Sequence, residues 1–205
     1  MPPRKPKPRK PATPKPRHPW EPPFALKGDS SEDDLFKAVG RALTDWEFVE
    51  EVLARVYAAL MRSDLYSPNP AIRAYGAIIG SKARIDMIRA AGDAYMTLPY
   101  TGTAVFPAQA REMFRPLLDE CVEWANRRND IAHGRVWGAD HSREYFLFPA
   151  LYSTKKWRLG QPPTYRYTSV EIRTFSAAFQ DLYDRLSELA EHFERWNAVW
   201  PRPRS

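Results

Sequence analysis

Apolar residues recur every three or four positions along most of the chain, the spacing that places them on one side of an α-helix. The first such stretch opens at Ser30 and Ser31, where a capping serine precedes three acidic residues. It ends at the Ser-Pro-Asn-Pro sequence of residues 67–70. We therefore predict a long amphipathic helix here, with its apolar stripe formed by Val39, Leu43, Trp46, Val49, Leu53, Val56 and Leu60.

A second helix is predicted from about Pro70 to Met96. Gly76 and Gly80 lie four residues apart within it, and each glycine costs about 1 kcal/mol in a helix interior. We expect the close approach of another helix to compensate for that cost. The inner side of this helix is predicted to consist of Ile72, Tyr75, Ile79, Ala83, Ile88 and Ala91.

The same periodicity predicts two more helices. The third spans roughly Ala108 to Ala132, is interrupted by Pro116, and is followed by Gly134, a residue typical of helix ends. The fourth has the most regular pattern in the chain, with Ile172, Phe175, Phe179, Leu182, Leu186, Leu189, Phe193 and Trp196 at steps of three and four.

Residues 135–168 break the helical period. Two runs rich in aromatic residues, at 145–152 and 164–168, predict strands on either side of residues 155–158. The expected fold class is thus all-α: a bundle of four long helices with a small β-hairpin inserted between helices 3 and 4.

Proline and charge are concentrated at the N-terminus. Residues 1–27 contain half of the 20 prolines and eight Lys or Arg against one acidic residue. Their charge is therefore about +7 and that of the other residues about −1, which together give the net charge of +6. Such a segment cannot form a core, and we expect a disordered basic tail over 1–27, a folded domain over 28–200 and a disordered C-terminus over 201–205. The tail either solubilises the protein or contacts nucleic acid electrostatically.

Several classes of protein are excluded. No run of 18 apolar residues exists and no apolar stretch follows the N-terminal charges, so we expect neither a membrane span nor a secretory signal. A single cysteine, Cys121, gives no internal disulfide and falls on an apolar helix side. The expected location is cytoplasmic, with no membrane partner.

Familiar catalytic motifs are also absent. The chain contains no GxSxG, no glycine-rich phosphate loop and no HExxH motif. Its four histidines, at positions 18, 133, 141 and 192, lack the spacing of metal ligands, so no cofactor is expected.

One polar segment, Arg127-Arg128-Asn129-Asp130-Ile131-Ala132-His133-Gly134, follows the third apolar stripe directly. On a helix Asn129 and His133 lie about 40° apart, whereas Arg128 lies about 140° from His133. An imidazole there can exchange protons near neutral pH, and an arginine can hold a phosphate. The alternative is structural: the arginines pair with acidic neighbours, and His133 packs against a tryptophan.

This segment, at the end of the third of four helices, resembles the signature of the HEPN superfamily, in which an Arg is followed after four to six residues by a His. Here Arg128, Asn129 and His133 fit that pattern, with four residues between the Arg and the His. Members are small α-helical proteins, commonly dimeric, and many are metal-independent endoribonucleases of toxin and defence systems.

The resemblance implies roles for three residues. His133 would transfer protons, Arg128 would contact the scissile phosphate, and Asn129 would orient one of them. It also implies RNA as substrate, cleaved through attack by its 2′-hydroxyl, and a homodimer that brings both motifs into one cleft. An antitoxin or regulatory protein is a further partner expected from the resemblance.

The predicted hairpin interleaves cations with aromatic residues, a pattern that suits stacking on single-stranded bases. Alternation in a half-buried hairpin explains the same pattern without any ligand. The residues expected to contact RNA are Arg127, Lys155, Lys156, Trp157, Arg158 and Arg166. The competing functional interpretation of the whole chain is a non-catalytic, dimeric helical interaction module with a nucleic-acid-binding tail.

Overall fold

The computed structural model describes residues 18–63, 69–97, 108–138, 143–153, 155–158 and 160–199. These residues are mostly helical and form five helices and one two-stranded antiparallel sheet. In chain order the elements are α1 (Glu32–Leu60), α2 (Pro70–Ala77), α3 (Ser81–Thr97), α4 (Ala108–Ala132), β1 (Gly134–Gly138), β2 (Tyr145–Pro149) and α5 (Ser169–Val199). None of the helices described is long and apolar enough to cross a membrane.

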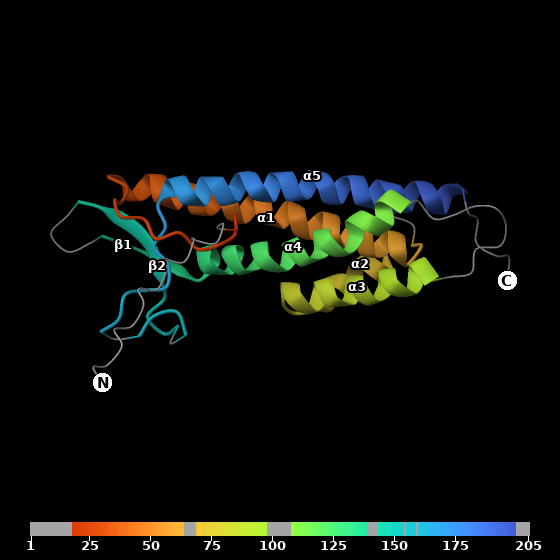
Figure 1. Ribbon diagram of the computed structural model, residues 1–205, viewed down its shortest axis with the longest axis horizontal. Helices are drawn as coiled ribbons and strands as arrows, with labels where there is room; N and C mark the ends of the chain where they lie inside the picture. The colour runs from red at the N-terminus through yellow and green to blue at the C-terminus, as the bar shows by residue number, and fades with distance from the viewer. Residues whose placement is uncertain are drawn as a thin grey trace, which may run out of the picture.

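Helices α1 and α5 lie side by side along the long axis of the molecule (Figure 1). Their apolar stripes face each other, so that the Trp46 ring meets the Phe179 ring at 5.1 Å, edge to face. The pair is also joined by a bidentate ion pair in which Arg55 donates two hydrogen bonds of 2.6 Å to Glu194. The two longest predicted stripes therefore form the central pair of the bundle.

Helix α4 covers one side of this pair, and α3 packs against both α4 and α1 (Figure 1). Their contact depends on Gly92, because a Cβ there would lie 2.1 Å from the ring of Phe114. Close approach thus occurs at Gly92, whereas nothing lies within 4 Å of a Cβ built at Gly76 or Gly80. The expectation of close approach at those two glycines is wrong.

The expected second helix is divided into α2 and α3. Gly80 adopts a φ of +89°, which is left-handed backbone, and the chain turns there between Ala77 and Ser81. The turn changes the phase of the apolar pattern, so Ile85 and Ile88 are buried whereas Ile79 is 94% exposed. The predicted inner side was correct for Tyr75 and Ile88 and wrong for Ile72, Ile79 and Ala83, which are exposed.

The division is stabilised by Glu50, a buried carboxylate of α1. It accepts hydrogen bonds from Tyr75 of α2 (2.6 Å), and from Ser81 (2.8 Å) and Arg84 (2.9 Å) of α3. Burial alone would raise the pKa of Glu50, but these hydrogen bonds outweigh it and hold the pKa below its usual range. The ionised carboxylate therefore fixes both short helices against α1.

The hairpin differs from the prediction in one strand. Its strands are β1 and β2, with Arg135 opposite Phe148 and Trp137 opposite Phe146. The segment expected as the second strand, 164–168, joins β2 only through an isolated bridge between Leu147 and Tyr167. The prediction missed β1 because it begins and ends with glycine, has only two apolar residues, and follows directly after a helix.

Residues 18–27 depart from the expected disordered tail, while residues 1–17 and 201–205 lie outside the described residues. Trp20 contacts Trp124 of α4, with ring centroids 6.3 Å apart. The buried Ala25 donates its backbone N–H to the carbonyl of Arg166 at 2.9 Å. The proline-rich composition predicted disorder, but a few apolar residues are enough to pack an extended segment against the rest of the fold.

Candidate functional site

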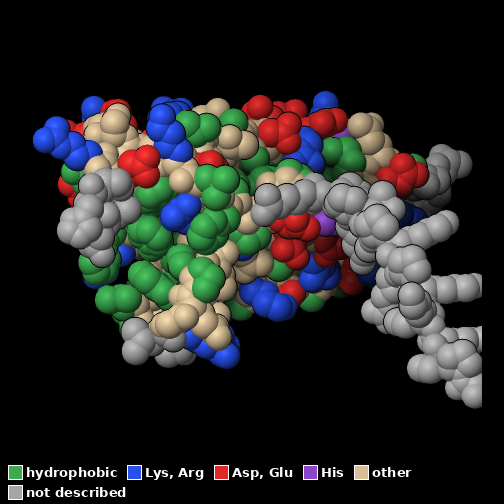
Figure 2. Space-filling view, turned by 60° about the vertical axis from the view of Figure 1, so that its left-hand side comes forward, with side chains coloured by type: hydrophobic (Ala, Val, Ile, Leu, Met, Phe, Trp, Pro, Cys, Tyr) green, Lys and Arg blue, Asp and Glu red, His purple; other side chains and the backbone are tan. Residues whose placement is uncertain are grey.

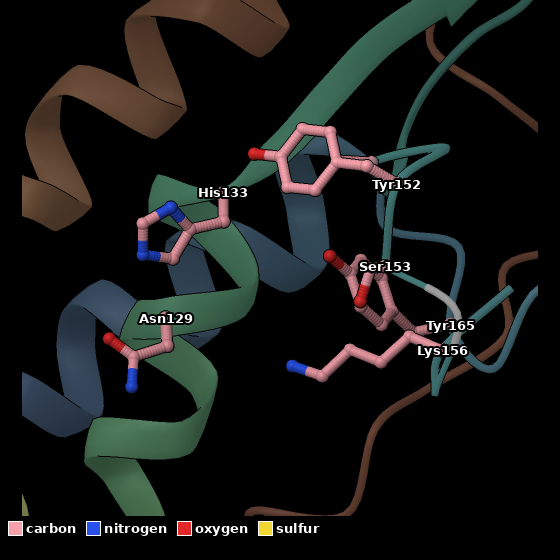
Figure 3. A pocket seen from close by; sticks show the side chains of 7 residues that line it. Asn129, His133, Tyr152, Ser153, Lys156 and Tyr165 are labelled. Atoms are coloured by element: carbon pink, nitrogen blue, oxygen red, sulfur yellow. The ribbon is translucent and has the colours of Figure 1, made fainter.

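The last turn of α4 forms one wall of a pocket of about 320 Å³ (Figure 3). Asn129 and His133 come from this turn, and the backbone N–H of His133 donates to the carbonyl of Asn129 at 3.1 Å. The opposite wall comes from the segment after β2, and Figure 3 shows its side chains directed toward the helix. That wall consists of Ala150, Tyr152, Ser153, Lys156 and Tyr165.

Gly134 allows the tight turn between α4 and β1. A Cβ at this position would lie 2.7 Å from the carbonyl oxygen of Asp130 and 2.8 Å from Leu147. Because glycine has none, β1 begins directly after His133 and pairs with β2. The exposed His133 is thus held between a helix end and a strand.

Asp130 is the buried centre of the site, with 1% of its surface exposed. Arg127 approaches one carboxylate oxygen at 2.9 Å, and Lys156 forms an ion pair with the other. The hydroxyl of Tyr167 donates to the carboxylate at 2.9 Å, and that of Tyr165 donates to the backbone carbonyl of the same residue at 3.0 Å. One carboxylate therefore ties α4 to both parts of the segment between β2 and α5.

The charges of this cluster do not cancel. Asp130 carries one negative charge, whereas Arg127 and Lys156 carry two positive charges, and Lys156 lines the pocket. Burial, and next to it the charge of Asp130, raise the pKa values of Tyr165 and Tyr167, so both hydroxyls stay protonated and act as donors. The cluster thus has one surplus positive charge, with Lys156 as its cation at the pocket wall, and this favours an anion such as a phosphate there.

Arg128 does not line this pocket. Its guanidinium contacts the side-chain oxygen of Asn129 and Glu47 of α1, each at 3.4 Å. This agrees with the 140° angle expected between Arg128 and His133 on a helix: Asn129 and His133 line the pocket, whereas Arg128 touches Asn129 from outside it. The structural alternative is also seen in part, since Arg127 and Arg128 both pair with acidic residues.

The cations expected to contact RNA have different surroundings. Lys155 and Arg158 are exposed, whereas Trp157 is half-buried and stacks on Phe148 at 5.8 Å. The guanidinium of Arg166 lies between Phe24 and Phe146, at 4.6 and 4.4 Å from the ring centroids. The neighbouring residues Tyr165 and Tyr167 are buried and stack on each other, so they cannot stack on a base.

Other chemically capable residues lie elsewhere. Cys121 is fully buried in α4, and burial raises the pKa of its thiol, which confirms its prediction as a core residue. His192 lies on α5, 3.6 Å from Glu188. Within the described part of the chain, no group of three His, Cys, Asp or Glu side chains is arranged to hold a metal ion.

The role of Asp130 was not predicted from the sequence, and of the wall opposite His133 only Lys156 was among the predicted site residues. The spacing of Arg127 and Asp130, three residues apart on a helix, indicates an ion pair. No local signal places Tyr152 and Ser153 opposite His133, because that juxtaposition depends on how the segment after β2 folds back.

Comparison with models of protein families, with curated proteins and with solved structures gave no match. The resemblance to the HEPN superfamily therefore rests on the residues from Arg128 to His133 and on the order of the helices.

Proposed function

We propose that the protein is a metal-independent endoribonuclease of HEPN type and that it acts as a component of a toxin or phage-defence system. The observation that carries the proposal is the pocket in which Asn129 and His133 face Lys156. It combines an exposed imidazole, an amide and a surplus positive charge in a space that accommodates a phosphate and part of a ribose.

The reaction needs only groups that the chain and the substrate supply. His133 takes the proton of an RNA 2′-hydroxyl, whose oxygen attacks the adjacent phosphorus while the bond to the 5′-oxygen breaks. The imidazolium that forms at His133 then gives a proton to the leaving 5′-oxygen. The products are a 2′,3′-cyclic phosphate and a 5′-hydroxyl, and positive charge from Lys156 stabilises the phosphorane-like transition state.

Arg128 enters this scheme through a homodimer. The residue lies on the side of α4 that faces Glu47, and its contacts of 3.4 Å are long for ion pairs. In a two-fold dimer with α4 ends facing each other, the Arg128 of one protomer reaches the phosphate held at the His133 of the other. The full charge of the site then comes from two chains.

A substrate that lacks the nucleophile tests the proposal. RNA is incubated with the protein in EDTA, and the ends of the products are analysed; a matched RNA carries a 2′-deoxy residue at the mapped cleavage position. We expect a cyclic phosphate on the first RNA and no cleavage at that position of the second. Equal cleavage of both would refute 2′-hydroxyl attack, and no cleavage of any RNA would favour the interaction module.

A further inference from the structure

The outer face of the hairpin carries an arginine and aromatic residues next to the pocket. Arg135 and Trp137 both point outward from β1, and the guanidinium of Arg135 lies 3.8 Å from the centroid of the Trp137 ring. Trp137 is 44% exposed although it is among the most apolar side chains. The cation thus holds an exposed aromatic plane in place on a strand.

Two further rings reach the surface next to this face. Phe148, which is half-buried, lies directly opposite Arg135 in the register of the hairpin, whereas Phe146, opposite Trp137, is fully buried. Trp157, also half-buried, stacks on Phe148 at an interplanar angle of 25°. We call the arginine and the three rings that reach the surface the hairpin platform: Arg135, Trp137, Phe148 and Trp157.

The segment of the chain that carries the platform is rich in cations. Among the described residues of 133–168, six are Lys or Arg and one, Glu144, is acidic. Lys155 lies two residues before Trp157 and Arg158 directly after it; both are exposed, and neither forms an ion pair with any other described residue. Figure 2 shows hydrophobic side chains gathered at this end of the molecule, with basic side chains among them.

The platform begins where the pocket ends. His133 immediately precedes β1, so Trp137 lies about 13 Å farther along, at 3.3 Å for each strand residue. At the other side, Lys156 lines the pocket and Trp157 follows it in the chain. A strand of nucleic acid seated in the pocket therefore passes over the platform.

We propose that the hairpin platform binds the bases of single-stranded RNA by stacking and positions the strand so that one phosphate enters the pocket. Stacking on Trp137 and Trp157 tolerates any base, and the surrounding cations contact the backbone. A duplex does not fit this mode, because its bases are already stacked on each other. The direction of RNA toward the pocket rests on the proposed function, whereas the binding itself does not.

Binding is measured separately from cleavage to test this. The full chain with His133→Ala is titrated into a fluorescein-labelled 12-nucleotide oligouridine in EDTA, and anisotropy is followed. We expect additional Trp137→Ala to weaken binding about tenfold or more. Trp137→Phe, which keeps an aromatic plane, is expected to stay within about threefold of the parent.

The control is Tyr183→Ala, which removes a 38% exposed aromatic residue from α5 and should leave binding unchanged. All variants carry the same basic N-terminal residues, so their shared electrostatic attraction cancels in the comparison. Single-stranded oligothymidine should compete as well as RNA does, and duplex RNA should compete poorly. Equal affinity of the Trp137→Ala and Tyr183→Ala proteins would overturn the proposal.

Cross-linking supplies a measurement that needs no substitution in the hairpin. Oligouridine containing 4-thiouridine is irradiated with the His133→Ala protein, and the linked peptides are identified by mass spectrometry. We expect cross-links in β1, in β2 and at Trp157, and cross-links confined to other segments would refute the platform. If RNA binds the platform but the wild-type protein does not cleave it, this inference stands and the proposed function is refuted. If the wild-type protein cleaves RNA but the platform does not bind it, the proposed function stands and this inference is refuted.

Discussion

Asp130 is buried between two cations and receives two tyrosine hydroxyl contacts, one on its carboxylate and one on its backbone carbonyl. It does not line the pocket, yet it holds Lys156 where the pocket needs positive charge. At the scale of single residues, the proposed site thus depends on a carboxylate that does not line the pocket. Its role is positional.

Replacing Asp130 with alanine should therefore cost stability as well as order in the pocket. We expect a loss of about 2–4 kcal/mol in the free energy of unfolding, because Arg127 loses a buried partner while the partly exposed Lys156 can turn to solvent. Urea unfolding followed by circular dichroism measures this. Asp181→Ala, which breaks the exposed pair with Arg185, is the control and should change the value by less than about 0.5 kcal/mol.

At the scale of elements, Glu50 joins three helices through an ionised carboxylate. Its folded-state pKa lies below the usual value of 4.5, so its contribution to stability is complete above that pH. As pH falls below 4.5 and through the folded pKa, the contribution is lost. We expect the unfolding free energy of the wild type to fall more steeply over this range than that of Glu50→Gln, and parallel pH profiles would contradict the account.

The segment at 18–27 should behave as part of the folded domain. Deleting residues 1–27 removes the contact of Trp20 with Trp124 and the buried Ala25. We expect the loss of these contacts to reduce the free energy of unfolding by about 2–3 kcal/mol. This lowers Tm by roughly 5–10 °C relative to a chain that begins at residue 18. Calorimetry of the two truncated chains decides the matter, and identical melting temperatures would show that these contacts contribute nothing.

Periodicity predicted the helical elements well where one stripe persists. Most residues of the stripes of α1 and α5 are buried as expected, because a regular apolar face has to pack against another, while Val39, Leu43 and Trp196 are half-buried. The break at Gly80 was missed, since it depends on a left-handed turn and on the hydrogen bonds to Glu50. Helix geometry likewise predicted that Asn129 and His133 share a face, which Figure 3 confirms.

Contacts between distant segments could not be read from the sequence. The wall opposite His133 comes from residues 17 to 32 positions later in the chain, and no periodic signal relates the two. The same holds for the docking of residues 18–27 against Arg166. Such contacts are fixed by how the hairpin and its following segment pack on the bundle.

At the scale of the whole molecule, the proposed dimer makes a prediction about shared sites. Arg128→Ala and His133→Ala chains should each be inactive, but their coexpressed heterodimers contain one complete site. If half of the dimers are mixed, we expect about a quarter of wild-type activity to return. Activity is measured on the same RNA for each protein alone and for the mixture; no recovery in a verified heterodimer would show that the two residues do not act across the dimer.

The central claim is that His133 carries proton transfer in metal-independent cleavage of RNA. The most direct test is the cleavage rate of one defined RNA in EDTA by the wild type, by His133→Ala and by His18→Ala as the control for loss of an exposed histidine. The account predicts that the wild type and the control cleave at similar rates and that His133→Ala is slower by about 10²–10⁴ while remaining folded. Undiminished cleavage by folded His133→Ala, or complete loss of wild-type activity in EDTA, would contradict it.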